Sequence, residues 1–276
     1  MHIKVAAIQM VSSTHREQNM ATAERLLEQA ATQGAQWALL PEYWPIMGQK
    51  DTDKLALAEP FGKGVLQDFL AATAKRLGMV IIGGTIPLQS GDENKVLNTM
   101  LTYNRDGELI GRYDKMHLFG FQGLGESYQE SDTIQAGAEV PKLEIDGITV
   151  AQGICYDVRF PELYRQLRAA GASVLLVPAA FTYVTGQAHW LPLLRARAIE
   201  NQCYVVAANQ CGQHGAGRHT WGHSVIIDPW GQQLAEAEHQ VGLIQAELDP
   251  QFLTQIRHDM PVLNHARLRS GWREPE

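Results

Sequence analysis

GICYDVRFPE, residues 153–162, marks a turn from a β-strand to a helix. The alternating apolar run 149–155 predicts a strand, and the helical spacing of 161–171 predicts a helix after it. A cysteine at such a turn is exposed at the end of a sheet, next to the positive end of the helix dipole. We therefore expect a lowered pKa for the Cys155 thiol and a Tyr156 backbone N–H that is free to face a developing oxyanion. A buried structural cysteine is the alternative that the turn alone leaves open.

Strand-like and helix-like runs alternate on both sides of this turn, which is the pattern of an α/β layered fold. Two Asp-Gly pairs, at 106–107 and 146–147, separate alternating runs and predict β-hairpins. Residues 117–133 are polar and glycine-rich without a clear period, which predicts a long loop that carries chemistry. The predicted strands are 3–10, 37–40, 79–85, 96–104, 108–114, 142–145, 149–155, 173–178, 203–210, 222–228 and 241–248, and the predicted helices are 14–34, 61–78, 161–171, 186–202 and 250–258.

Composition and charge exclude several classes of protein. The chain has 276 residues, 45% of them hydrophobic and 19% charged, which is enough apolar surface for a large core and excludes a disordered chain. A net charge of −7 without a basic run argues against a nucleic-acid partner. No apolar stretch approaches the roughly 18 residues that span a bilayer, and residues 1–10 are too short and strand-like for a secretory signal. We expect a cytoplasmic protein without a membrane partner.

The cysteines and histidines do not form the patterns of metal sites. Cys155, Cys203 and Cys211 lack C-x-x-C spacing and are interpreted as reduced thiols. The histidines at 214, 219 and 223 have no second cluster of acidic or sulfur ligands beside them, so we expect no metal. The chain also lacks a linker rich in Pro, Ser or Gly, which predicts one domain over 1–266 and a polar C-terminal tail over 267–276.

Two further ionisable residues follow predicted strands. Glu42 comes after the apolar segment 37–40, where packing gives no reason for a charge, and Lys115 follows the strand 108–114. Because ligands gather outside the carboxyl ends of strands in α/β sheets, Glu42, Lys115 and Cys155 are expected to converge on one pocket. Each residue alone also fits a solvated strand end, but three such residues in this order favour a site.

These three residue types can together cleave an acyl bond. A carboxylate beside an apolar wall has a raised pKa, so it can take the thiol proton and return it to a leaving amine. A lysine ammonium is a fixed positive charge for the tetrahedral oxyanion, and the thiolate supplies covalent catalysis. The sequence therefore predicts a cysteine-dependent hydrolase with Glu42, Lys115 and Cys155 in these roles.

Three segments of the chain resemble the signature blocks of the nitrilase superfamily of carbon–nitrogen hydrolases. They are Pro41-Glu42, YDKMHL at 113–118 and CYDVRFPE at 155–162, and the resemblance extends over essentially the whole chain. It implies a four-layer αββα sandwich that assembles as a homodimer or a higher homo-oligomer. It also implies a Glu-Lys-Cys triad that forms a thioester acyl-enzyme with no metal or organic cofactor.

The family often has a second glutamate in the loop after the lysine. Here Tyr128-Gln129-Glu130-Ser131 is similar to that element, which indicates Glu130, although Glu126 lies in the same loop and is the rival candidate. The resemblance implies that this glutamate holds Lys115 charged and positions the substrate amide or the attacking water. A solvated loop acid is the alternative for either residue.

Several later segments resemble the branch of the family that hydrolyses deaminated glutathione to 2-oxoglutarate and cysteinylglycine. They include TGQAHW at 185–190, LRARAIE at 194–200 and CYVVAANQCG at 203–212. The expected pocket residues are His189 and Trp190, at the start of a helix, with Thr182 as a donor to an oxo-acid carboxylate. Arg159 fits either a carboxylate clamp or a structural partner at a helix start.

Other functions remain open from the sequence. Residues 43–48, YWPIMG, depart from the pattern of these amidases and leave the identity of the amide in doubt. The alternatives within the superfamily are an ω-amidase acting on 2-oxoglutaramate, a carbamoylase and a nitrilase. Outside it, the alternative is a non-catalytic binding subunit, which the intact set of Glu42, Lys115 and Cys155 argues against.

Overall fold

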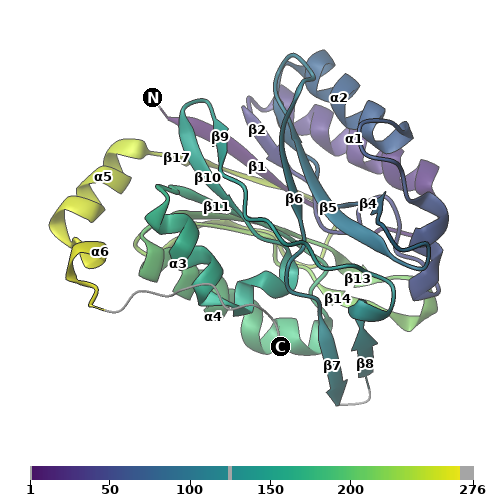
Figure 1. Ribbon diagram of the computed structural model, residues 1–276. Helices are drawn as coiled ribbons and strands as arrows, with labels where there is room; N and C mark the ends of the chain where they lie inside the picture. Colours follow the sequence, from purple (N-terminus) through teal and green to yellow (C-terminus); the bar gives the residue numbers. More distant parts are fainter. Residues whose placement is uncertain (1, 124–125, 268–276) are drawn as a thin grey trace.

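Two β-sheets lie face to face at the centre of the molecule (Figure 1). The computed structural model describes residues 2–123 and 126–267. In the first sheet the order is β17(Gly242–Leu248), β1(Ile3–Gln9), β2(Trp37–Leu39), β3(Val80–Ile82), β5(Val96–Tyr103) and β4(Ile86–Gln89), with β6(Leu109–Asp114) also paired to β5. In the second it is β16(Gln233–Glu236), β15(Val225–Ile227), β12(Tyr204–Asn209), β11(Val174–Ala179), β10(Ile148–Gln152) and β9(Leu143–Ile145).

Alternation along β1 shows why the sheets are covered on both faces. Val5 and Ala7 belong to the core between the two sheets, whereas Ala6 and Ile8 belong to a second core beneath the helices of the first sheet. Successive side chains of a strand point to opposite faces, so a continuous apolar run is buried on both sides. The parallel pairs β1–β2 and β2–β3 are of this kind, as are β10–β11 and β11–β12.

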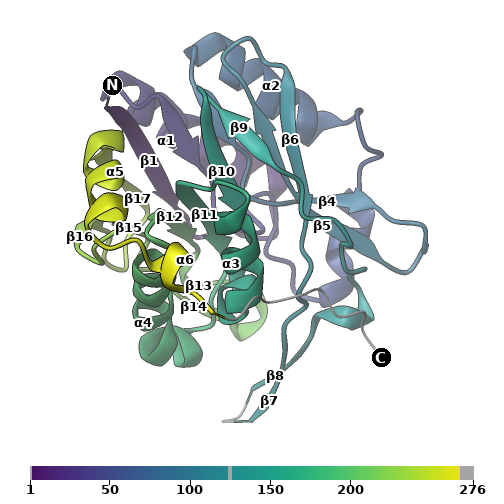
Figure 2. The same cartoon turned by 60° about the vertical axis from the view of Figure 1, so that its left-hand side comes forward.

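The helices form the outer layers, so that the order of layers is helix, sheet, sheet, helix (Figures 1 and 2). The layer on the first sheet is α1(Arg16–Thr32) and α2(Val65–Leu77), and the layer on the second is α3(Pro161–Ala169) and α4(Tyr183–Asn201). After β17 the chain continues into α5(Pro250–Asp259) and α6(Val262–His265). The predicted αββα sandwich is confirmed.

Both predicted hairpins are present. β5 and β6 are joined through Asp106-Gly107, and β9 and β10 through Asp146 and Gly147, which both have positive φ angles of 52° and 77°. Two consecutive positive φ angles are the signature of the type I′ turn, which suits the twist of a hairpin.

Other local predictions were wrong. The predicted loop 117–133 contains an antiparallel pair, β7(Gly120–Gly123) with β8(Glu126–Gln129), followed by a 3₁₀ turn, η2(Glu130–Asp132). The predicted strand 79–85 is shorter and is followed by β4, and the cysteine is followed by a 3₁₀ turn, η3(Cys155–Arg159), before α3 begins. Further short elements had no period to reveal them: η1(Asp51–Leu57), η4(Gly215–Gly217) and the pair β13(Cys211–Gln213) with β14(His219–Trp221).

Among the described residues, no helix has the length and apolar character needed to cross a membrane. The predicted tail beyond residue 267 lies outside the described residues.

Candidate active site

Glu42, Lys115 and Cys155 meet where the ends of strands from the two sheets come together. Glu42 follows β2, Lys115 follows β6, and Cys155 follows β10. Lys115 Nζ lies 2.9 Å from Glu42 Oε1, and both side chains are fully buried. The Cys155 thiol lies close enough to hydrogen-bond the Glu42 carboxyl, and Cys155 and Glu42 line the same cavity. The structure thus brings the three predicted residues to one place.

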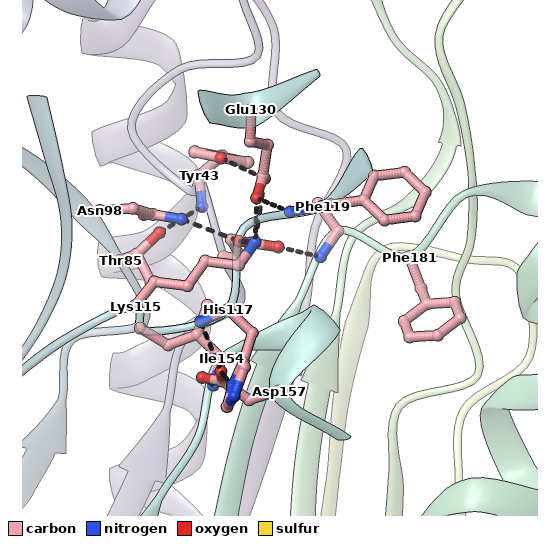
Figure 3. Close-up of polar contacts among 12 residues, drawn as sticks. Tyr43, Thr85, Asn98, Lys115, His117, Phe119, Glu130, Ile154, Asp157 and Phe181 are labelled. Atoms are coloured by element: carbon pink, nitrogen blue, oxygen red, sulfur yellow. Dashed lines mark hydrogen bonds and ion pairs between the residues drawn. The ribbon is translucent and has the colours of Figure 1, made fainter. Parts of the chain in front are cut away.

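Glu130 is the second carboxylate on Lys115. Its two oxygens lie 2.9 and 2.7 Å from Lys115 Nζ. They also accept hydrogen bonds from the Tyr43 hydroxyl at 2.8 Å and from the Phe119 backbone N–H at 2.7 Å (Figure 3). The Glu130 N–H in turn donates to the Phe119 carbonyl, so the base of the β7–β8 hairpin fixes this carboxylate. The side chain of the rival, Glu126, lies outside what the structure describes.

The Glu42 carboxylate is held in one orientation by neutral donors. Its Oε1 accepts a hydrogen bond from Asn98 Nδ2 at 2.8 Å in addition to the contact with Lys115, and its Oε2 accepts one from the Ala180 backbone N–H at 2.9 Å. Asn98 also accepts from the Lys115 backbone N–H, so one β5 residue braces both members of the ion pair.

Burial and charge set the proton affinities of these groups. Burial raises the pKa of Glu42, and the negative charge of Glu130 adds to this, while Lys115 opposes both. Burial also disfavours the charge on Lys115, but the neighbouring Glu130 and Glu42 carboxylates outweigh it, so the pKa of Lys115 is raised. Burial opposes ionisation of Glu130 too, yet Lys115 and the hydrogen bonds lower its pKa. The site therefore contains one fixed cation, one fixed carboxylate and one carboxylate suited to accept a proton.

The turn at Cys155 is strained and tightly packed. Cys155 has a φ of 46°, a left-handed conformation that is uncommon for residues other than glycine. A methyl group on Gly153 would lie 2.3 Å from the Tyr164 hydroxyl oxygen, so a larger residue does not fit there. Such sharp turns from a strand into a helix present nucleophiles at the edge of α/β sheets.

The buried carboxylate of Asp157 fixes this turn through four hydrogen bonds. Its Oδ2 accepts from the Ile154 N–H and the Tyr113 hydroxyl, both at 2.8 Å. Its Oδ1 accepts from the His117 N–H at 3.1 Å and lies 2.7 Å from His117 Nδ1 (Figure 3). Tyr113 and His117 flank Lys115 in the sequence, so Asp157 ties the lysine segment to the cysteine turn.

The expected lowering of the thiol pKa was wrong. Burial raises the pKa of Cys155 well above its ordinary value, and the negative charge of Glu42 raises it further, although Lys115 and the Ala180 N–H act in the opposite direction. The sequence argument relied on a helix N-terminus beside the sulfur, but a 3₁₀ turn of five residues follows Cys155 and the helix starts only at Pro161. Burial and the neighbouring carboxylate therefore dominate.

Two hollows have Cys155 in their walls. The larger, here called the main hollow, encloses about 790 Å³ of space, which includes open solvent. The smaller, here called the side hollow, has a volume of about 210 Å³. Both are lined by Phe119, Cys155, Ala180 and Thr182; Glu42, Lys54, Glu130 and Arg218 line the main hollow, and Tyr156, Arg159, Phe181 and Thr185 line the side hollow.

The predicted substrate contacts divide between the cavity walls and the core. Tyr156 lies in the wall of the side hollow, and Thr182 lies between the two hollows. His189 is exposed, and its Nδ1 lies 3.2 Å from Arg159 Nη1 at the edge of the side hollow. Trp190 is fully buried in the core, where its Nε1 donates to the His223 carbonyl at 2.7 Å. It is absent from the described walls of both hollows because its position on α4 turns it toward the second sheet.

Within the two described ranges, residues 2–123 and 126–267, no group of three His, Cys, Asp or Glu side chains converges in a way that could hold a metal ion. Of the histidine stretch, His214 is buried against Ser12 and Thr220, and His223 pairs with Glu236.

Sequence reasoning missed the groups that position the triad. Asn98, which donates to Glu42, lies at an unremarkable place in a predicted strand. The donors from Phe119 and Ala180 are backbone N–H groups, which carry no side-chain signal. Asp157 alone had a local signal, since it lies two residues after the cysteine in the signature block.

Comparison with known proteins gives a consistent picture. Residues 4–258 match the carbon-nitrogen hydrolase family. A deaminated glutathione amidase from Synechocystis sp. is 44% identical over 264 residues, which are 94% of this chain and 96% of that protein. The crystal structure of Saccharomyces cerevisiae Nit3, a member of branch 10 of the nitrilase superfamily, aligns with a TM-score of 0.87 at 31% identity over 97% of each chain. A mutant amidase from Nesterenkonia sp., 26% identical with a TM-score of 0.78 over 95% of this chain and 99% of that one, carries acrylamide added to its active-site cysteine.

Proposed function

This chain belongs to the carbon–nitrogen hydrolase family of the nitrilase superfamily, and we propose that it is an amidase for deaminated glutathione. One observation carries the choice of substrate: proteins named deaminated glutathione amidase match this chain at 36–44% identity over nearly its full length. The geometry of Glu42, Lys115, Glu130 and Cys155 supports the chemistry.

Acylation begins with proton transfer from Cys155 to Glu42. The raised thiol pKa means that the thiolate forms only as the Glu42 carboxylate takes the proton, and the raised pKa of Glu42 suits it to do so. The sulfur attacks the amide carbonyl carbon, and the carbonyl oxygen becomes an oxyanion that Lys115 Nζ and the Tyr156 N–H stabilise. As the C–N bond breaks, the leaving amine of cysteinylglycine takes the proton from Glu42.

Deacylation uses the same carboxylate. Water enters beside the thioester, and Glu42 accepts its proton as the oxygen attacks the carbonyl carbon. The C–S bond then breaks, 2-oxoglutarate is released, and the cysteine sulfur regains a proton from Glu42. Lys115 keeps its positive charge throughout because Glu130 and Glu42 flank it. No step requires a cofactor.

The two hollows can hold the two parts of the substrate. The Arg159 guanidinium in the wall of the side hollow offers a planar fork for the oxo-acid carboxylate of the acyl group. Arg159 lies over the Phe181 ring at 5.1 Å and beside His189, which hold the guanidinium in place. Thr182 and Tyr156 line the same hollow as Arg159 and Cys155.

We also propose a cytoplasmic homodimer or higher homo-oligomer. Three free, buried cysteines are compatible with a reducing compartment. Ile199 on α4 and Trp230 in the turn after β15 are 43% and 60% exposed, and Gly231 next to Trp230 packs against Ile199. An exposed apolar pair on the outer helical layer supports self-association through that layer.

The test is a paired assay of the purified protein on deaminated glutathione and on 2-oxoglutaramate, with release of 2-oxoglutarate as the readout. We expect a higher kcat/KM for deaminated glutathione. A higher kcat/KM for 2-oxoglutaramate would assign the chain as an ω-amidase, and no turnover of either would reject the substrate class while leaving amide hydrolysis in place.

A further inference from the structure

Lys54 is a half-buried cation in the wall of the main hollow. Its Nζ donates to the Thr133 hydroxyl at 3.1 Å and lies 5.5 Å from the centroid of the Tyr43 ring. No carboxylate of the described residues lies within 4.0 Å of it. A lysine ammonium has three N–H donors, and among the described residues the Thr133 hydroxyl is the one acceptor that this ammonium bonds.

Lys115 and Arg218 already have carboxylate partners, and Lys50, which also lines the main hollow, is exposed. Lys115 contacts Glu42 and Glu130, and Arg218, in the same wall as Lys54, pairs with Asp51. Burial lowers the pKa of Lys54, and the charges of Glu130 and Asp51, which lie beyond ion-pair distance, act in the opposite direction. A partly desolvated ammonium without a carboxylate, facing a cavity, is a binding position for an anion.

The chemistry of the cleavage decides which part of the substrate enters the main hollow. Glu42 lines the main hollow and is absent from the described lining of the side hollow. Because Glu42 protonates the leaving nitrogen, that nitrogen and the peptide attached to it must lie on the Glu42 side of the sulfur. Deaminated glutathione carries two carboxylates, one on the acyl group and one at the end of the leaving dipeptide.

We propose that Lys54 binds the terminal carboxylate of the leaving dipeptide and thereby selects a peptide amide over a simple amide. This inference rests on the proposed function and adds a specificity residue to it. Tyr43 links Lys54 to the catalytic groups, since its ring lies beside the ammonium and its hydroxyl donates to Glu130. Tyr43 also lines the main hollow, so a dipeptide in that hollow that reaches Lys54 lies beside the Tyr43 ring.

The test compares substrates that differ only in the leaving group. Deaminated glutathione has the carboxylate, its glycinamide analogue replaces that carboxylate with an amide, and 2-oxoglutaramate leaves only ammonia. Lys54→Met removes the charge at similar length, Lys54→Arg keeps it, and Lys142→Met is the matched control, since Lys142 is exposed and pairs only with Glu144 among the described residues.

We expect Lys54→Met to lower kcat/KM for deaminated glutathione by about 10- to 100-fold, the range for loss of one charge-assisted hydrogen bond, mainly through KM. Its kcat/KM for 2-oxoglutaramate and for the glycinamide analogue should stay within about twofold of the wild type. Lys54→Arg should restore most of the loss, and Lys142→Met should cause none.

Equal losses on all three substrates would overturn the inference, because they would mean that Lys54 acts on Glu130 electrostatically or supports the fold. An unchanged kcat/KM for deaminated glutathione would overturn it as well. Both results leave the proposed function standing, whereas a wild-type enzyme that ignores deaminated glutathione rejects the function and the inference together.

Discussion

Replacing Asp157 with asparagine tests whether the cysteine turn is held by a charged hydrogen-bond acceptor. Asp157 is fully buried. One of its oxygens contacts the Ile154 N–H and the Tyr113 hydroxyl, and the other contacts the backbone N–H and the ring Nδ1 of His117. Asparagine has nearly the same shape but presents an NH₂ group in place of one oxygen. Whichever way the amide is oriented, one backbone N–H, from Ile154 or from His117, loses its acceptor.

The cost follows from those contacts. An orphaned buried donor costs about 1–3 kcal/mol, and the remaining bonds lose the strengthening that a charged acceptor gives. We expect Asp157→Asn to destabilise the fold by about 3 kcal/mol, which corresponds to a fall in Tm of about 5–10 °C for a chain of this length. Activity should fall at temperatures where the variant is still folded, because the turn that orients Cys155 is loosened.

The assay is thermal and urea unfolding, followed by circular dichroism, with kcat/KM measured well below the Tm of the variant. Asp259→Asn is the matched control, since Asp259 is an exposed residue at the end of α5 and its replacement should leave Tm unchanged. A Tm for Asp157→Asn within error of the wild type would refute the argument that this carboxylate holds the turn.

Three further outcomes follow from the site. Activity should be lost as pH falls, because Glu42 works as the carboxylate. Since the pKa of Glu42 is raised, the acid limb of the kcat/KM profile should lie above the ordinary carboxyl range. An acid limb at or below that range would contradict this. Glu130→Gln should lower kcat/KM by about 10- to 100-fold. Because the Glu130 charge raises the pKa of Glu42, this substitution should also shift the acid limb to lower pH. A merely structural role of Glu130 would not shift the limb. Gly153→Ala should destabilise the protein by about 1–3 kcal/mol in urea unfolding, since the added methyl would lie 2.3 Å from the Tyr164 hydroxyl; unchanged stability would show that the turn can relax.

The ends of strands were the part of the site that the sequence could predict. Glu42, Lys115 and Cys155 each follow an apolar run, and the carboxyl ends of such strands meet in the fold, so their convergence needed only the order of the elements. The hairpins at Asp106-Gly107 and Asp146-Gly147 were predictable for a similar reason, because the turn chemistry is local.

Properties that depend on tertiary packing could not be predicted in this way. The direction of the Cys155 pKa shift depends on burial and on the distance to Glu42, neither of which a local pattern contains. The place of Trp190 near the start of a predicted helix fits a pocket residue as well as a core residue. The packing of α4 on the second sheet places this side chain in the core. The backbone donors from Phe119 and Ala180 come from segments whose side chains give no sign of them.

The central claim is that Cys155 is the nucleophile, and turnover of Cys155→Ala tests it most directly. The three cysteines are all buried, but among the described residues only Cys155 lines a hollow with Glu42, so Cys211→Ala and Cys203→Ala are matched controls. The account predicts a folded Cys155→Ala protein that releases no 2-oxoglutarate from deaminated glutathione, beside two control variants that remain active. Substantial turnover by folded Cys155→Ala would contradict it.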